Sequence, residues 1–403
     1  MLSNNDGCVV SRSNEAKKVG VPMGVAVYEI EKLIKQHKVI MLSSNFSLYA
    51  DMSSRVMKTL DLFASELEVY SIDEAFISLD TLWSEHKPNL LKEIQQTVYK
   101  HTGIPISLGG ASTKTMAKLA NRISKKMVAN NQPVDFKLVS QAQIDSWMKQ
   151  IAVEDVWGVG FRTTPKLNRL GIQTAYDLKV ADVKAMKKEF GVCLYRTIQE
   201  LNEITCLPLG ETSTSFGRSE GARQSIACTR TFGKRIYKLE HLEEALTQYI
   251  SMACQKLRSQ KSVARMMHMY IRSGKHTTGS AFYIKSAVIK LPEHTDDTRI
   301  LVKEASKQLR QIYKHGVGYK KAGVTLFEIL PKAGFASNMF WGAELSKSHV
   351  TDKTFSAVDC VNKKWGDSTV KLASQGTLNI WKSKRELVSN RFTTCWNELL
   401  KVS

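Results

Sequence analysis

Two adjacent carboxylates, Asp73 and Glu74, stand between the apolar runs 67–70 and 76–79. Neighbouring side chains of a strand point to opposite faces, so both acids can reach one metal only where the strand bends or turns. Mg²⁺ prefers oxygen ligands and usually takes one or two protein carboxylates, which leaves positions for water and substrate phosphates. The pair is therefore compatible with phosphoryl chemistry at a magnesium site, or with an ordinary solvated hairpin turn.

A cationic helix is the second feature that could do chemistry. After the strand-like run 104–108, the glycine-rich turn 109–113 leads into a helix with an apolar stripe. On its other face the spacing predicts a row of cations, namely Lys114, Lys118, Arg122 and Lys125. Such a row is usually a solvated face. Its start at a glycine-rich turn, in the same segment as the acids, favours phosphate contact.

A glycine turn between short helices is the third feature. Gly158, Val159 and Gly160 precede a short helix that contains Lys166. The backbone amides of such a turn can contact a DNA phosphate without reading any base. This is the helix-hairpin-helix signature, and the basic surroundings favour DNA contact over a plain interhelical turn.

The composition limits the partners. The 403 residues suggest two to four domains, and the formal charge of +20 indicates a polyanion, with nucleic acid ahead of an anionic membrane surface. No apolar run is long enough to span a membrane, and the N-terminus lacks a signal peptide, so we expect a soluble, cytoplasmic protein. Seven scattered cysteines without a C-x-x-C pair argue against disulfides and zinc.

The elements that must position these residues fall into four segments. Segment 1–150 alternates strand-like and helix-like patterns, with helices expected at 14–19, 51–67 and 92–102. Segment 151–220 has helical patterns throughout. Segment 223–332 follows the order β-α-β-β-α-β of a ferredoxin-like unit, and its stretch 228–332 holds 20 Lys and Arg against 8 Asp and Glu. Its free sheet face would suit a duplex backbone. Segment 336–403 is expected to be loop-rich, with four tryptophans and no catalytic motif.

Several motifs, taken in order, resemble those of the Y-family DNA polymerases, and most closely their UmuC-type branch. They are Leu2–Val10, Ser43–Asn45, Leu48–Ser53, Tyr70–Phe76, Ala117–Asn121 and Asp155–Gly158, and they run nearly end to end. The resemblance implies an α+β multidomain fold shaped as a polymerase right hand. The palm would be 1–150, with fingers at about 7–45. A helical thumb at 151–220, a DNA-binding little finger at 223–332 and a C-terminal region at 336–403 would follow.

The resemblance also implies residue roles. Asp73 and Glu74 would hold two catalytic Mg²⁺ ions, while Lys17 and Lys125 would contact the nucleotide triphosphate. Asn14 stands where many relatives have a tyrosine that touches the triphosphate. The implied activity is nucleotidyl transfer, in which a primer 3′-hydroxyl attacks the α-phosphate of a dNTP. In the family this is error-prone translesion synthesis during the SOS response. The alternative is a catalytically inactive remnant that binds only DNA or partner proteins.

Two departures from the family pattern accompany this resemblance. Family members open with a strand that holds another metal-binding aspartate, followed by an aromatic residue that excludes the ribose 2′-hydroxyl. This chain starts later in the pattern, so we expect the first palm strand and one carboxylate ligand to be missing. Asn338, Met339 and Phe340 match a clamp-binding peptide without its glutamine. The implied partners are primer-template DNA, a processed UmuD-type dimer, a recombinase filament and the sliding clamp.

Overall fold

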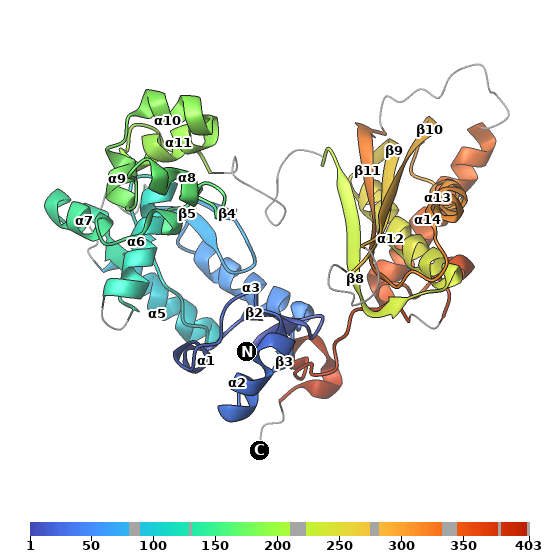
Figure 1. The fold of residues 1–403 in the computed structure, drawn as a ribbon, viewed down its shortest axis with the longest axis horizontal. Coiled ribbons are helices and arrows are strands. Elements are labelled where there is room, and N and C mark those ends of the chain that lie inside the picture. Colours follow the sequence, from blue (N-terminus) through green and yellow to red (C-terminus); the bar gives the residue numbers. More distant parts are fainter. Residues whose placement is uncertain are drawn as a thin grey trace. The chain divides into compact units, whose positions relative to one another are not determined.

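The computed structural model describes residues 1–79, 89–128, 131–209, 223–274, 282–332, 345–377 and 380–400. The chain forms two compact units, shown as a ribbon in Figure 1. Unit 1 combines Met1–Asn45 with Gly221–Asn390, and unit 2 combines Phe46–Glu220 with Arg391–Ser403. Each unit therefore contains pieces from distant parts of the sequence.

Unit 1 begins with a small three-stranded sheet in the order β2-β1-β3. Its strands are β1 (Leu2–Asn4), β2 (Cys8–Ser11) and β3 (Leu42–Ser43), with β1 antiparallel to β2 and parallel to β3. Helices α1 (Asn14–Lys18) and α2 (Glu31–Gln36) lie between β2 and β3 in the chain. A small apolar cluster with Val9, Ala16, Val21 and Ile30 at its centre holds this segment together.

The second sheet of unit 1 has four strands in the order β10-β9-β11-β8, all antiparallel to their neighbours. Along the chain the elements are β8 (Ile226–Ile236), α12 (Leu239–Ser259), β9 (Ser262–Ser273), β10 (Ile284–Thr295), α13 (Thr298–Ile312) and β11 (Tyr319–Pro331). The predicted β-α-β-β-α-β succession is confirmed. Because β11 lies between β8 and β9, and β9 lies between β10 and β11, both β-α-β units are split.

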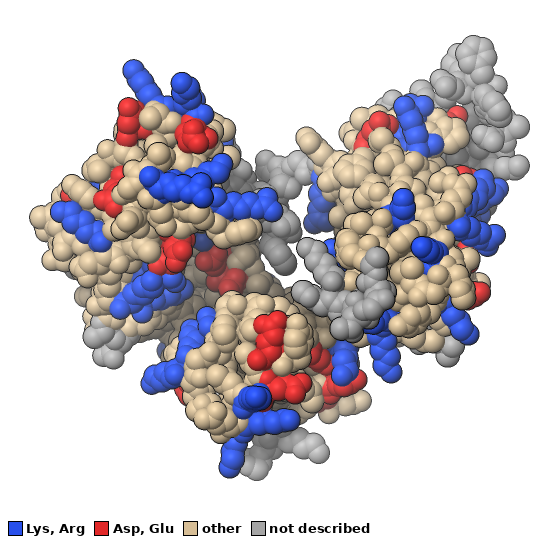
Figure 2. All heavy atoms as spheres, in the orientation of Figure 1, with Lys and Arg blue, Asp and Glu red and all other residues tan. Residues whose placement is uncertain are grey.

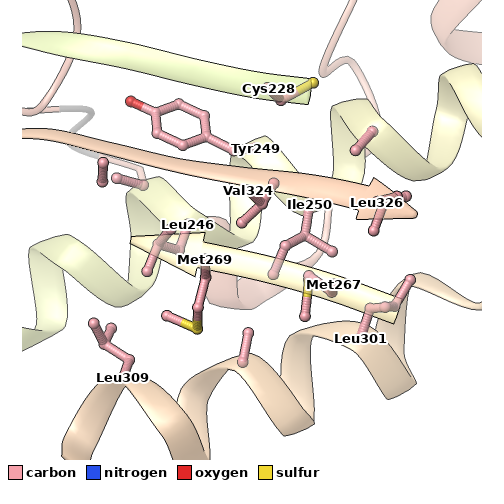
Figure 3. Packing of buried hydrophobic residues seen from close by; sticks show 14 of the residues in the cluster. Cys228, Leu246, Tyr249, Ile250, Met267, Met269, Leu301, Leu309, Val324 and Leu326 are labelled. Carbon is pink, nitrogen blue, oxygen red and sulfur yellow. The ribbon is translucent and has the colours of Figure 1, made fainter. Parts of the chain in front are cut away.

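Both helices cover one face of this sheet (Figure 1). Figure 3 shows Leu246 and Ile250 of α12 and Leu309 of α13 packed near Met267 and Met269 of β9. Buried residues recur every second position in β9 and at helical spacing in α12, which is the pattern of half-covered strands and an amphipathic helix. Burying each large side chain contributes about 1.5–3 kcal/mol, so this core gives the sheet a rigid support.

Unit 2 starts with α3 (Phe46–Asp61), the hairpin β4 (Glu66–Val69) and β5 (Ala75–Ser78), and α5 (Leu90–Thr102). The helix expected at 51–67 thus begins and ends earlier, because 66–69 pairs with 75–78. The prediction of a strand at 104–108 is wrong. The strand in this part of the chain is β6 (Gly109–Gly110), which precedes α6 (Lys114–Met127) and pairs with β7 (Val134–Asp135) after that helix.

The described stretch 141–201 of unit 2 is mainly helical, as the sequence predicts for the segment after 150. Its helices are α7 (Gln141–Met148), α8 (Thr164–Arg169), α9 (Ala175–Lys179), α10 (Val183–Phe190) and α11 (Val192–Leu201). They share one apolar cluster with α6, built around fully buried residues such as Ile123, Met148, Leu167 and Ile198. The cationic helix is therefore fixed on its apolar side by the helical segment.

The C-terminal region is less loop-rich than the sequence suggests. It contains α14 (Leu345–Trp365), followed by short 3-10 turns. Trp381 is buried whereas Trp365 and Trp396 are exposed, and Trp341 lies outside the described residues. Within the described part of the chain, no helix is both long and apolar enough to cross a membrane.

Candidate active site

Asp73 and Glu74 lie in the turn of the β4–β5 hairpin. The last paired residues are Val69 and Ala75, and the amides of Tyr70 and Ser71 both donate to the Glu74 carbonyl, at 3.0 Å each. The Ser71 hydroxyl donates to Asp73 Oδ1 at 2.6 Å. Both carboxylates are exposed. The prediction that the two acids occupy a bend in a strand pair is confirmed.

Lys118 of α6 forms an ion pair with Glu74. Its Nζ lies 2.9 Å from Glu74 Oε2, and it also lies 4.7 Å from the ring centre of Tyr70 and 5.4 Å from that of Trp157. A cation above aromatic faces is stabilised by the ring quadrupoles. Lys118 therefore has a fixed place beside the acidic turn.

Three aromatic rings pack against one another beside the turn that holds Asp73 and Glu74. Tyr70 and Trp157 pack edge to face with ring centres 5.6 Å apart, and Phe76 lies 5.9 Å from Tyr70 and 5.5 Å from Trp157. Trp157 Nε1 donates to the Tyr70 hydroxyl at 3.2 Å. Such pairs are worth about 0.5–1.5 kcal/mol beyond their buried area. The cluster joins the hairpin to the helical segment. The sequence did not predict it, because Tyr70 and Phe76 lie far from Trp157 along the chain.

The row of cations on α6 does not form one solvated face. Lys114 is buried and pairs with Glu68 at 2.7 Å, so the prediction of a surface residue is wrong for it. Further along, Arg122 and Lys126 both pair with Asp155. Burial raises the pKa of Asp155, but the hydrogen bond from Lys126 and the charge of Arg122 outweigh burial and lower it overall.

Lys125 differs from these neighbours. It is exposed, and among the residues that the structure describes no acidic side chain forms an ion pair with it. Lys114, Lys118 and Arg122 each pair with a carboxylate, whereas Lys125 has no such partner among the described residues.

The glycine-rich turn before α6 has a packing role. A Cβ at Gly109 would collide with the backbone of Asn121 and Ala117, so only glycine lets the strand approach the helix this closely. The start of α6 is buried, and Glu200 accepts from the Thr115 amide at 3.2 Å and from the Thr115 hydroxyl. A carboxylate of the chain therefore occupies the helix start. Phosphate contact by this helix stays a prediction, and it concerns the exposed end of the helix at Lys125.

The glycine turn of the helical segment has the predicted form. Gly158 adopts φ +91°, and a Cβ there would lie 2.7 Å from Thr197 Oγ1. Val159 is buried and fixes the turn, whereas Gly160 and Lys166 are exposed. The turn therefore presents backbone and a lysine to solvent between η4 (Val153–Asp155) and α8.

The other predicted site residues lie elsewhere. Asn14 and Lys17 belong to α1 in unit 1, where Lys17 Nζ donates to Asn14 Oδ1 at 3.2 Å and both are exposed. Asn338, Met339 and Phe340 lie outside the described residues. On the face shown in Figure 2, Lys and Arg are spread over both units and do not gather in one patch. Among the described residues, no group of three or more His, Cys, Asp and Glu side chains could hold a metal.

Comparison with protein families gives three matches. A model described as the impB/mucB/samB family matches residues 1–122, and the model of that family's C-terminal domain matches residues 223–338. A third model, a domain of unknown function (DUF4113), matches residues 353–402.

Individual relatives cover nearly the whole chain. Protein UmuC of Salmonella typhimurium is 36% identical over 100% of this chain and 93% of that protein. Protein ImpB of Salmonella typhimurium is 34% identical over 99% of this chain and 92% of its own length. DNA polymerase IV of Listeria monocytogenes is 25% identical over 81% of this chain and 86% of that protein.

Among solved structures, a Y-family DNA polymerase chimera covers 80% of this chain and 91% of its own, with a TM-score of 0.58 and 20% identity. At this identity the similarity concerns the fold.

Proposed function

The chain belongs to the impB/mucB/samB family, the UmuC-type Y-family DNA polymerases, and from this premise we propose that the turn holding Asp73 and Glu74 is its catalytic centre. It is an error-prone translesion DNA polymerase subunit of SOS mutagenesis and DNA repair, a template-directed nucleotidyltransferase. The observation that supports the assignment is the exposed pair of carboxylates on a hydrogen-bonded hairpin turn, with Lys118 beside it.

The donor set fits a hard divalent cation. Asp73 and Glu74 offer carboxylate oxygens at an exposed turn, and Mg²⁺ commonly takes one or two such ligands. When bound, the metal would stabilise the attacking and leaving oxygens of the phosphoryl transfer. The hairpin bonds at Tyr70 and Ser71 limit the movement of both acids. Lys118 balances the charge of Glu74 until a cation shares that carboxylate.

Cations of two helices would bind the nucleotide. We assign Lys125 to the triphosphate because it is exposed and has no ion-pair partner among the described residues. Lys17 and Asn14 are assigned to the same ligand, since they present a linked ammonium and amide on α1.

The DNA backbone would contact two further surfaces. The Gly158–Gly160 turn and Lys166 offer amides and a charge that suit a phosphate without reading sequence. The uncovered face of the four-stranded sheet belongs to a segment with 20 basic against 8 acidic residues. Binding through these contacts should weaken steeply as salt rises.

The domain assignments remain part of this proposal. We place the palm at 1–150 with fingers at about 7–45, the thumb at 151–220, the little finger at 223–332 and a C-terminal region at 336–403. Association with a processed UmuD-type dimer, a recombinase filament and the sliding clamp is proposed on family membership, with Asn338, Met339 and Phe340 as the clamp contact. We propose a cytoplasmic location because the substrate is DNA.

Primer extension on a template with an abasic site tests the catalytic centre. The double variant Asp73→Ala/Glu74→Ala should lose Mg²⁺-dependent nucleotide incorporation while it still binds primer-template DNA. The matched control is Asp61→Ala/Glu66→Ala, which removes the same charge from exposed acids near the hairpin. Incorporation that survives in the first variant would overturn the metal assignment.

The same assay addresses the catalytically inactive alternative, which these relatives do not favour. That alternative predicts salt-sensitive DNA binding by the unchanged chain without any incorporation, in the presence and absence of its proposed partners.

A further inference from the structure

The segment Lys382–Asn390 of the C-terminal region runs along the edge strand β8. The Gly233 amide donates to the Lys382 carbonyl at 3.1 Å, and the Ser383 hydroxyl donates to the Thr231 carbonyl at 3.3 Å. A Cβ at Gly233 would lie 2.6 Å from Lys382 O and 2.9 Å from Lys384 N. Only glycine allows this approach, so the contact is built into the strand.

The same segment then binds the turn between β1 and β2. The Lys384 amide donates to Asn5 Oδ1 at 2.6 Å, and the Glu386 amide donates to Asp6 Oδ2 at 2.8 Å. Asn5 and Asp6 adopt φ +53° and +46°, a left-handed backbone that these two residue types tolerate well. Both side chains therefore face the C-terminal segment as acceptors.

Beyond this turn the segment continues the small sheet. The Ser43 amide donates to the Leu387 carbonyl at 2.8 Å, the Leu387 amide donates to Ser43 Oγ at 2.9 Å, and Val388 bridges to Ser43 in parallel. Asn45 Nδ2 donates to the Ser389 carbonyl at 3.3 Å. Residues 387–388 thus extend the order β2-β1-β3 beyond β3, and Figure 1 shows the red chain passing beside β3.

Asn5 links the two contacts. Its Oδ1 accepts from Lys384, while its Nδ2 donates to the Phe232 carbonyl of β8 at 3.3 Å. In the described part of unit 1, this is the one direct hydrogen bond between Met1–Asn45 and the four-stranded sheet. The other hydrogen bonds of this junction run through residues 382–390.

The part of the C-terminal region before this segment is fixed to α12. Arg258 donates two hydrogen bonds to Asp359 of α14, at 2.6 and 2.9 Å. Its guanidinium carbon lies 4.7 Å from the ring centre of Phe355. Trp381 lies buried against Tyr249, with ring centres 5.6 Å apart. The segment 382–390 therefore starts from a rigid point, which reduces the entropy lost when it binds.

We propose that the region matched by the model of unknown function is an internal strap. In this role α14 and Trp381 anchor it to α12, and residues 382–390 tie segment 1–45 to the four-stranded sheet. The receptor for the strap consists of Asn5, Asp6, Ser43, Asn45 and the Gly233 edge of β8. The Asn-Asp turn and the Ser-Ser-Asn motif thereby gain a function that needs neither nucleotide nor metal, and the strap is independent of the catalytic proposal.

Amide hydrogen exchange on the full chain tests the strap with two variants. Gly233→Ala places a methyl group against the strap backbone. Asn5→Gly keeps the left-handed turn but removes both the acceptor for the Lys384 amide and the donor to Phe232. In both we expect the amides of Lys384, Glu386 and Leu387 to exchange about tenfold faster or more, as lost hydrogen bonds predict. The amides of Ser43 and of β1 should also exchange faster, because the strap holds segment 1–45 in place.

The matched control is Gly7→Ala, in the same turn as Asn5, where a new Cβ would meet only Asn5 O at an ordinary 3.5 Å. It should leave the strap protected. Unchanged exchange of the β9 amides shows that each variant is folded. If Gly233→Ala disturbs the sheet itself, Asn5→Gly alone provides the test.

Two results would overturn the proposal. One is unchanged exchange of the strap amides in Asn5→Gly. The other is a released strap that leaves segment 1–45 as protected as before, because the strap would then tie nothing. Faster tryptic cleavage after Lys384 and Arg385 provides a second readout of release.

Discussion

Two lysine–carboxylate pairs join α6 to the β4–β5 hairpin one helical turn apart, and they differ mainly in burial. Lys114 and Glu68 are 2.7 Å apart with side chains 4% and 2% exposed. Lys118 and Glu74 are 2.9 Å apart with side chains 21% and 45% exposed. The residue types and distances are nearly the same, so the surroundings decide what each pair can do.

Burial makes the first pair permanent. Removing one partner would leave an uncompensated charge where water cannot reach it, and Lys114 also donates to the Pro208 carbonyl at 2.7 Å. The exposed pair lies in a higher effective dielectric, where its attraction is weak and a carboxylate can exchange one cation for another. The buried pair therefore fixes the distance between helix and hairpin, and the exposed pair leaves Glu74 available for a metal.

The largest expected effect is on catalysis, and it distinguishes Glu74 from the structural Glu68. Glu74→Gln should lower primer extension about a thousandfold, since a metal ligand supplies several kcal/mol of transition-state stabilisation. The hairpin should stay folded, because Glu74 is exposed and its backbone bonds do not change. Single-turnover incorporation measures the loss, with exposed Glu66→Gln on β4 as control. A Glu74→Gln enzyme with nearly full activity would make the exposed pair as structural as the buried one.

The next effect concerns stability. Lys114→Ala should destabilise the contact between α6 and the hairpin by about 3–5 kcal/mol, because it strands the Glu68 charge. Hydrogen exchange of the β4, β5 and α6 amides measures this change. The double variant Lys114→Met/Glu68→Leu should recover part of the loss, since it removes both charges. Equal exchange in the single variant and the parent chain would mean that water reaches the pair.

The difference between these pairs could not be predicted from the sequence. Helical spacing correctly placed Lys114 and Lys118 on one face of α6, and adjacent acids correctly indicated a bend at Asp73. Spacing cannot tell which part of that face another element covers. Glu68 reaches Lys114 only through the β4–β5 pairing, and Glu200 reaches the helix start from a distant helix. These long-range contacts bury the first turn of α6, so the predicted phosphate contact of this helix, which stays a prediction, concerns its exposed end at Lys125.

The fold shows the same limit. Period-two and helical patterns predicted the six elements between 226 and 331, because each has one covered and one open face. The position of β11 between β8 and β9 depends on the chain's path and leaves no local pattern. Gly233 looks like an ordinary weak point of a strand, although its missing side chain admits the strap.

A smaller effect is expected for the lysine of the exposed pair. Lys118→Ala removes a positive charge that competes for Glu74, so the Mg²⁺ concentration for half-maximal extension should fall by about two- to fivefold, as for an exposed ion pair. Lys118→Arg should stay close to the parent enzyme. Lys126→Ala changes a cation of the same helix that contacts Asp155 and serves as control. A higher Mg²⁺ requirement in Lys118→Ala would mean that Lys118 helps to organise the site more than it competes.

The smallest effect comes from Asp155 of η4, the third acid that pairs with α6, whose side chain is intermediate in exposure between those of Glu68 and Glu74. Burial raises the pKa of Asp155, but Lys126 and Arg122 lower it overall below its ordinary value of 3.8. A carboxyl with a lowered folded-state pKa stabilises the fold fully above its unfolded pKa, and this contribution disappears as the pH falls through the folded value. Asp155→Asn should therefore cost about 0.5 kcal/mol at pH 6, the size typical of partly exposed pairs, and less below pH ~3.8.

The difference in exchange of the last-turn α6 amides, between Asp155→Asn and the parent chain at pH 6 and at pH ~3.5, measures this change. A difference that grows as the pH falls would contradict the sign, and would mean that burial of Asp155 outweighs its two cations. Asp155 would then resemble Glu68, whose environment is set by burial, more than Glu74, whose environment is set by access to cations.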